Sequence, residues 1–328
     1  MQYLLALFVL FQSLTLFAFE RVIIWGHKLH SHTHSYVHYG FHKAFKHLGY
    51  EVHWLDNDDD ISEINFANSL FITEHQVDQN MPLRDDSYYV VHNSSNSKFD
   101  FIKQLNHYIS IRTYHDINLK SDTLQEVEPY IYYDIPKSTL VCPWATDLLP
   151  SEIEEQKKLL LNPQKRNHFE IYWVGTIGDG EGGNIHQISP FIEACKKNHV
   201  KFIHSSPWGN PISFDENRKL IQKSYMAPTI CGAWQVKNGY IPCRIFKNIS
   251  YGKIGVTNSQ RVYELFQKKI VYNEDTHQLF YDAKKALKNF DQSQMLELMD
   301  FVKEHHTYLN RCAHIISFIK LLSAQGKI

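Results

Sequence analysis

Residues Tyr240–Ser259 read YIPCRIFKNISYGKIGVTNS, and this stretch contains one predicted helix followed by one predicted strand. Pro242 fits the first helical position because its missing N–H would have no intrahelical partner there, and Gly252 fits the position just past the helix end. The apolar run in KIGVTN then predicts a short strand. A helix that leads into a buried strand is the repeating unit of an α/β domain.

Two cations lie close together in the first turns of this predicted helix. Arg244 and Lys247 are three residues apart, so they share one helix face. Positive charges at the positive end of the helix dipole cost about 0.3–1 kcal/mol each. An arrangement that lowers stability indicates an anionic ligand, and a forked guanidinium together with backbone amides suits a diphosphate. The alternative is a pair of solvated or ion-paired surface cations.

Short apolar runs alternate with amphipathic segments on both sides of this stretch. The second half contains the runs EIYWVG, VKFIH, YMAPTI, KIGVTN and KIVYN, and the first half contains RVIIW, EVHWL, SLFIT, YYVVH, YISIRT and STLVCPW. The predicted fold class is α/β, with two Rossmann-like domains facing across a cleft and a C-terminal helical segment. The predicted domains are residues 19–160, 161–290 and 291–328, and the chemistry is expected in loops after strands.

Composition and the N-terminus limit the classes of function. The 328 residues carry a net charge of −1, which gives no general electrostatic reason to bind nucleic acid. Five cysteines form no Cys-x-x-Cys pair, so a zinc ribbon is not supported. Residues 1–18 are apolar and read as a signal peptide or an N-terminal anchor. We therefore expect an exported or membrane-associated protein, in a periplasm or a secretory lumen, or one retained on the cytoplasmic face.

Histidines are concentrated just after the first predicted strand. KLHSHTHS, together with the later ITEH, resembles the opening motifs of the polymerase and histidinol phosphatase metal-dependent phosphoesterases. That resemblance implies a hydrolase with metal ligands at His30, His32, Glu74 and His75. Lys28 stands where that family has an aspartate, and a cation beside a metal ion is electrostatically unfavourable.

We therefore prefer the interpretation that most of these histidines are structural and that the chain has no metal site. On this interpretation His34, His38 and His42 line the helix face opposite the apolar stripe. One or two loop histidines could still face the cleft as a general base, because imidazole titrates near neutrality.

The second half resembles the donor-binding domain of glycosyltransferases of the two-Rossmann (GT-B) type. WVGTIGDG resembles the glycine-containing loop that opens that domain, and GYIPCRIFKNISYGKIGVTN resembles a Gly-x-Pro-x-Arg-x-Phe-Glu segment followed by glycine. The resemblance covers roughly residues 169–272. Where the family has the glutamate that binds ribose, this chain has Lys247, which cannot accept hydrogen bonds. The resemblance also implies a terminal helix that crosses back to the first domain.

The resemblance implies roles for six residues on the donor side. Gly175 and Thr176 would approach the donor phosphates, Arg244 would bind the diphosphate, and Asn258 and Ser259 would flank the sugar or phosphate. Lys247 would contact phosphate in place of ribose, unless the donor is unusual or the protein binds without turnover.

The expected function is transfer of a sugar from an activated donor, a nucleotide diphosphate sugar, to an unknown glycan, lipid or protein acceptor. No cofactor or metal is expected, because the resemblance implies a cation-stabilised leaving group and Asp58-Asp59-Asp60, after EVHWLDN, is better read as a solvated cluster that starts a helix. His27, His30 and His92 are the candidates for the acceptor base, since each lies at or after a first-half strand end. The alternatives are the metal-dependent phosphoesterase or a noncatalytic nucleotide- or carbohydrate-binding protein.

Overall fold

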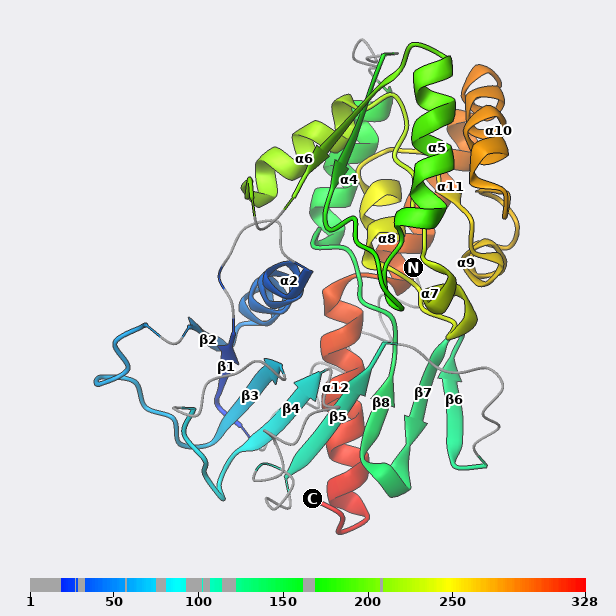
Figure 1. The fold of residues 1–328 in the computed structure, drawn as a ribbon. Coiled ribbons are helices and arrows are strands. Elements are labelled where there is room, and N and C mark those ends of the chain that lie inside the picture. Colours follow the sequence, from blue (N-terminus) through cyan, green and yellow to red (C-terminus); the bar gives the residue numbers. More distant parts are fainter. Residues whose placement is uncertain are drawn as a thin grey trace.

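The computed structural model describes residues 19–26, 28, 33–56, 58–74, 81–92, 102, 107–113, 122–161, 169–206 and 209–328. Figure 1 shows two α/β units stacked on one another, with the first half of the chain forming the lower sheet and the second half the upper unit. The α/β fold class predicted from the sequence is confirmed.

The first half forms one sheet of eight strands, in the order β2-β1-β3-β4-β5-β8-β7-β6. The strands are β1 (Arg21–Trp25), β2 (Glu51–Leu55), β3 (Ser69–Glu74), β4 (Tyr88–His92), β5 (Tyr108–Arg112), β6 (Leu124–Glu128), β7 (Ile131–Asp134) and β8 (Thr139–Val141). The six strands from β2 to β8 in this order pair in parallel, as their buried apolar runs predict. β7 and β6 add an antiparallel hairpin at the edge, which the sequence patterns did not reveal.

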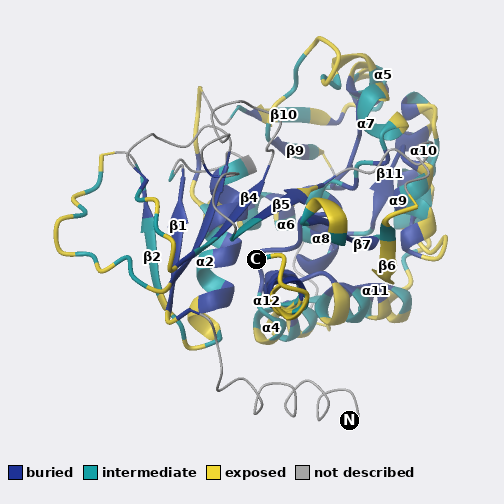
Figure 2. Ribbon diagram, turned by 90° about the horizontal axis from the view of Figure 1, so that it is seen from below, coloured by how far each residue is buried: buried dark blue, intermediate teal, exposed yellow. Residues whose placement is uncertain are grey.

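Two helices from opposite ends of the chain cover one face of this sheet. Helix α2 (Thr33–His47) and the C-terminal helix α12 (Tyr308–Ala324) pack together, and both share an apolar core with Val22 and Ile24 of β1. The alternate residues Ile23 and Trp25 belong to a separate core on the other face. Figure 2 shows β1 and β4 in the dark blue of buried residues.

The second half is a smaller parallel sheet surrounded by helices. Its elements are α4 (Pro150–Leu161), β9 (Glu170–Val174), α5 (Ile185–Lys197), β10 (Lys201–Ser205), α6 (Phe214–Lys223), α7 (Ala233–Lys237), α8 (Cys243–Ser250), β11 (Val256–Thr257), α9 (Gln260–Leu265), β12 (Val271–Tyr272), α10 (Thr276–Lys288) and α11 (Gln292–His305). β9 pairs with β10, and β11 pairs with β12, both in parallel. The segment 225–230 joins the two pairs, because Tyr225 N–H donates to Glu170 O at 2.7 Å and Thr229 N–H donates to Val256 O at 2.7 Å.

The chain crosses between the two units twice. Ile153 of α4 packs in a second-half core, although the sequence analysis assigns residues up to 160 to the first domain. Helix α12 returns to the first half, where the buried guanidinium of Arg311 donates to Pro143 O at 2.7 Å. The structure thus contains the crossing terminal helix that the GT-B resemblance implies.

Within the described part of the chain, no helix combines the length and the apolar character that a bilayer-spanning segment needs. Residues 1–18, the predicted signal peptide or anchor, lie outside the described residues.

Candidate functional site: two cations of one helix and a histidine–carboxylate cluster

Arg244 lies in the first turn of α8, the helix that the opening stretch of sequence predicts. Pro242 is the N-cap of α8, so the helix begins at Cys243, one residue later than expected. Gly252 follows the helix end with φ +85°. The guanidinium carbon of Arg244 lies 3.8 Å from the ring centroid of Trp173, a buried residue of β9. This cation–π contact positions the guanidinium at the carboxyl end of the strand.

Gly175 directly follows β9 and lets the backbone approach this guanidinium. Its φ of +133° is a conformation that residues with a side chain rarely adopt, and an added Cβ would lie 2.5 Å from Arg244 Nη2. The loop then turns into α5, where Asn184 N–H and Ile185 N–H both donate to Gly178 O at 3.0 Å. Thr176, in the same loop, is exposed. A strand, a glycine-containing turn and a helix start in this order form the usual cradle for a phosphate.

The electrostatics of Arg244 favour an anionic ligand. The side chain is partly buried, and this burial lowers the pKa of Arg244 to about 10, so it is charged at neutral pH. Among the described residues, no carboxylate forms an ion pair with it and no group accepts a hydrogen bond from its nitrogens. A partly desolvated cation without a counter-ion is unfavourable, and a bound phosphate would supply both charge and acceptors.

Lys247 lies one turn further along α8 and reaches the first half of the chain. Its ammonium nitrogen lies 3.8 Å from the ring centroid of Tyr36 in α2. Burial lowers the pKa of Lys247 to about 8. No described residue accepts a hydrogen bond from this ammonium or pairs with it. The two cations therefore share one helix face, as predicted, but Arg244 packs on the second half and Lys247 packs on the first.

A buried carboxylate joins the two halves beside Lys247. Asp147, in the connection before α4, accepts hydrogen bonds from the hydroxyls of Tyr36 and Tyr251, the latter at 2.7 Å. Its backbone N–H donates to the Tyr36 oxygen at 3.0 Å. Nearby, the rings of Tyr39 and Phe214 stack with centroids 4.2 Å apart. The halves therefore meet through a specific polar and aromatic contact, and Lys247 lies next to it on Tyr36.

Asn258 and Ser259, predicted to flank the donor, have structural partners. Both amide atoms of Asn258 bond to the backbone of Cys231, with Oδ1 accepting at 2.8 Å and Nδ2 donating at 2.9 Å. Ser259 is the N-cap of α9 and accepts from Val262 N–H. These bonds fix the segment at Cys231 and the start of α9. Direct contact of either side chain with a donor stays a prediction.

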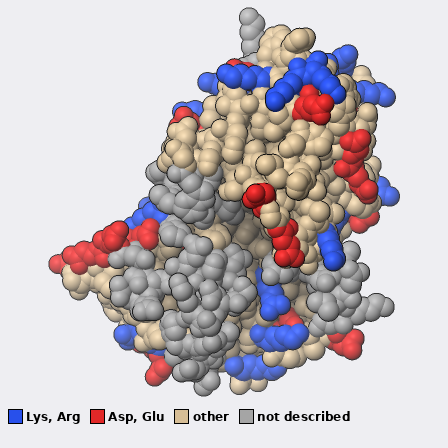
Figure 3. Space-filling model, in the orientation of Figure 1, with Lys and Arg blue, Asp and Glu red and all other residues tan. Residues whose placement is uncertain are grey.

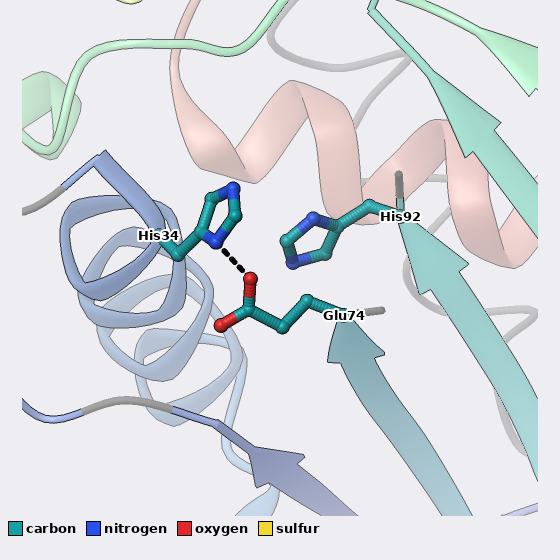
Figure 4. A group of neighbouring side chains, drawn as sticks. All are labelled: His34, Glu74 and His92. Carbon is teal, nitrogen blue, oxygen red and sulfur yellow. Dashed lines mark ion pairs between the residues drawn. The ribbon is translucent and has the colours of Figure 1, made fainter. Parts of the chain in front are cut away.

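A second cluster lies at the carboxyl edge of the first-half sheet. Glu74 and His92 are the last residues of β3 and β4, and the parallel register places them side by side. His34, in the first turn of α2, forms an ion pair with Glu74 through Nδ1 (Figure 4). One candidate ligand atom from each residue lies within 4.8 Å of the other two. His92 was predicted as a cleft residue, whereas its grouping with His34 was missed.

The predicted outward position of His38 is wrong. His38 is fully buried, and its Nε2 lies 3.1 Å from His92 Nε2. The reason is helical periodicity: positions 34, 38, 41 and 45 fall on one stripe, so His34 and His38 continue the apolar stripe of Phe41 and Phe45 toward the sheet. The sequence periodicity alone therefore places His38 on the apolar face, whereas the prediction places it on the opposite face.

The other proposed histidines cannot be placed. His27 and His30, candidates for the acceptor base, and His32 and His75, from the phosphoesterase alternative, lie outside the described residues. Of the four ligands that this alternative requires, only Glu74 is described.

Comparison with known proteins supports the fold. No protein-family model matches the sequence, and no curated protein matches it. Among solved structures, an alpha-glucosyltransferase in complex with UDP and a 13-mer DNA containing a HMU base aligns with a TM-score of 0.57 and 10% identity, over 92% of this chain and 99% of that chain. The alpha-glucosyltransferase (AGT) in complex with UDP aligns with a TM-score of 0.56 and 11% identity, over 90% and 99%.

At these identities the alignments establish the architecture. The chain has the GT-B fold of two Rossmann-like units, which confirms the resemblance drawn from the sequence. The alignments run almost the whole length of both proteins, so the first half, which lies outside the segment of the sequence resemblance, belongs to the same architecture.

Proposed function

We propose that this protein is a glycosyltransferase that binds a nucleotide diphosphate sugar at Arg244. The observation that carries the proposal is the guanidinium stacked on Trp173 and packed in the space where a Cβ at Gly175 would lie, with no counter-ion among the described residues. In a GT-B fold this position is the carboxyl end of the first strand of the second half, facing the other half. UDP is present in both alpha-glucosyltransferase structures that share the fold.

Catalysis would follow from stabilising the leaving group. When the bond between the sugar and the diphosphate breaks, negative charge develops on the diphosphate. Arg244 and Lys247 would stabilise that charge without a metal ion at the phosphates. Because Lys247 contacts Tyr36 of the first half, its ammonium would add to this stabilisation when the two halves are together. Closure of the halves would thereby be coupled to transfer.

The acceptor would approach from the first half. His92 is fully buried, so it would need rearrangement to touch an acceptor hydroxyl directly, and His27 and His30 remain predicted bases. We propose a glycan, lipid or protein acceptor. Figure 3 shows cations and anions interspersed on the described part of one face, with no extended basic field of the kind that duplex nucleic acid requires.

We propose that residues 1–18 direct export or anchor the chain at a membrane. If they do, the donor must be present in that compartment or on the membrane face where the protein is retained. A nucleotide donor fits a secretory lumen or the cytoplasmic face, whereas a lipid-linked donor would be required in a periplasm.

A thermal-shift panel tests the proposal. The purified protein would be melted with nucleoside diphosphates and nucleotide sugars, with and without EDTA, and each hit would then be assayed for sugar transfer and hydrolysis. A ligand at about 100 times its Kd adds about 2.7 kcal/mol and raises the melting temperature by a few degrees.

We expect one nucleotide to shift melting in both conditions. No nucleotide shift, with melting lowered by EDTA, would contradict the proposal and favour the phosphoesterase. A shift with neither transfer nor hydrolysis across the panel would favour a noncatalytic binding protein.

A further inference from the structure

The cluster at the carboxyl edge of the first-half sheet gathers three candidate metal ligands from three separate elements. Glu74 ends β3, His92 ends β4, and His34 lies in the first turn of the helix that follows β1. Parallel pairing aligns Glu74 with His92, so the two side chains leave the sheet side by side. Figure 4 shows the imidazoles of His34 and His92 on either side of the Glu74 carboxylate. Their ligand atoms fall within 4.8 Å of one another.

The burial of this group requires a positive charge. The side chain of Glu74 is 1% exposed, and a carboxylate removed from water is unfavourable unless a cation compensates it. A protonated His34 would compensate the charge alone, but it would give no reason for a second imidazole at the same point. Beside such a pair a neutral His92 contributes at most one N–H hydrogen bond, and a charged His92 adds repulsion. A bound dication, in contrast, is attracted by all three groups.

We propose that His34, Glu74 and His92 bind one divalent transition-metal ion, with Zn²⁺ as the ion that fits the ligand set. Two imidazole nitrogens and one carboxylate oxygen are typical ligands for zinc and its first-row neighbours, whereas Mg²⁺ and Ca²⁺ select oxygen ligands. Three protein ligands leave a coordination position open. The side chain of His34 is 14% exposed, so the open position lies on its side of the cluster.

The surroundings hold His92 in a fixed orientation. The Nε2 atom of His38 lies 3.1 Å from that of His92, and the ring of Trp144 packs edge-on against His92 at 5.1 Å between centroids. Gly26 packs so closely against His38 that an added Cβ would lie 2.2 Å from its ring. A ligand ring fixed by packing and by a neighbouring polar group loses little freedom when it binds a metal.

This ion would be held only by residues of the first half of the chain, none of which belongs to the proposed diphosphate site. The inference therefore does not depend on the proposed sugar transfer, and direct measurement of bound metal tests it without an activity assay.

The test is a zinc titration of chelator-treated full-length protein, with bound metal measured by equilibrium dialysis and elemental analysis. We expect the wild-type protein to bind one zinc ion. Glu74→Gln and His92→Ala should each weaken this zinc binding by about tenfold or more. His53→Ala is the matched control, because His53 also faces a glutamate, Glu51 at 2.7 Å, but on the exposed edge strand β2. This control should bind zinc like the wild type.

Two further measurements guard against loss of folding in variants of buried residues. His34→Ala alters the partly exposed ligand, and Co²⁺ bound to the wild-type protein reports its coordination through its visible absorption. We expect a Co²⁺ spectrum of a four-coordinate nitrogen and oxygen site, displaced by Zn²⁺ and lost in His34→Ala. Absence of zinc binding to the wild type, or binding unchanged in His34→Ala, Glu74→Gln and His92→Ala, would overturn the inference.

Discussion

Replacing Arg244 with alanine should weaken the binding of a nucleoside diphosphate while the protein stays folded. The guanidinium has no ion-pair partner among the described residues, so its removal leaves no described carboxylate without its counter-ion. The side chain loses its contact with Trp173, and such a cation–π contact contributes about 0.5–2 kcal/mol to stability. The main loss should therefore appear in binding.

The magnitude follows from the contacts that a phosphate would make. A hydrogen bond to a charged group contributes about 1.5–3 kcal/mol, which corresponds to a Kd raised by roughly tenfold to about hundredfold. Arg244→Lys keeps the charge and loses the fork, so its Kd should lie between those of the wild type and Arg244→Ala. Isothermal titration calorimetry with the nucleotide identified by the thermal-shift panel measures all three values.

Arg261→Ala provides the matched control. Arg261 also stacks on an aromatic ring, with its guanidinium carbon 4.9 Å from the ring centroid of Tyr130, but it lies on α9 and its ring partner belongs to the first half. Its removal should leave the Kd unchanged. An unchanged Kd in Arg244→Ala, or an equal loss in both variants, would refute the argument that Arg244 is the anion site.

Three other predictions concern Gly175, Lys247 and Asp147 around the same site. Gly175→Ala should lower the free energy of unfolding by roughly 1–3 kcal/mol in a denaturant titration, because it strains the backbone. It should also weaken nucleotide binding, because the added Cβ displaces Arg244. Unchanged stability and binding would contradict the argument that position 175 requires glycine. Nucleotide affinity should fall as the pH rises through about 8, where Lys247 loses its proton, and Lys247→Met should abolish this part of the pH profile; an identical profile in the variant would show that Lys247 does not contact the anion. Asp147→Ala should destabilise the protein by about 3 kcal/mol or more, against a smaller loss for Tyr251→Phe, since it removes the acceptor of two buried hydroxyls; equal losses would locate the effect elsewhere.

The local elements of the donor side could be predicted because their signals lie close together in the sequence. Pro242 and Gly252 delimit α8 within one residue, and the apolar run after them forms β11. The spacing of Arg244 and Lys247 alone placed both cations on one face. Such signals depend only on backbone geometry, which short stretches of sequence specify well.

The partners of these cations could not be predicted because they come from distant parts of the chain. Trp173 opens the WVGTIGDG segment, but like Tyr36 it reads as an ordinary core aromatic. Their rings meet Arg244 and Lys247 only after the two units have folded and docked. The same reason applies to α4, which the predicted boundary at residue 160 assigns to the first domain, while Ile153 packs in the second half.

The histidine cluster was partly predictable. His92 was expected in the cleft because it ends a strand, and Glu74 entered through the phosphoesterase alternative. Their pairing depends on the adjacency of β3 and β4, and the inward position of His34 depends on the rotation of α2. Sequence periodicity gives the stripe, but here His34 and His38 were judged polar and assigned outward.

A crystal structure of the protein with its best-binding nucleoside diphosphate would test the central claim most directly. The account predicts the diphosphate between the guanidinium of Arg244 and the loop from Gly175 to the start of α5, with the Lys247 ammonium on the side of Tyr36. A diphosphate bound instead at His34, Glu74 and His92, with no ligand at Arg244, would contradict the account and identify the first-half cluster as the reacting site.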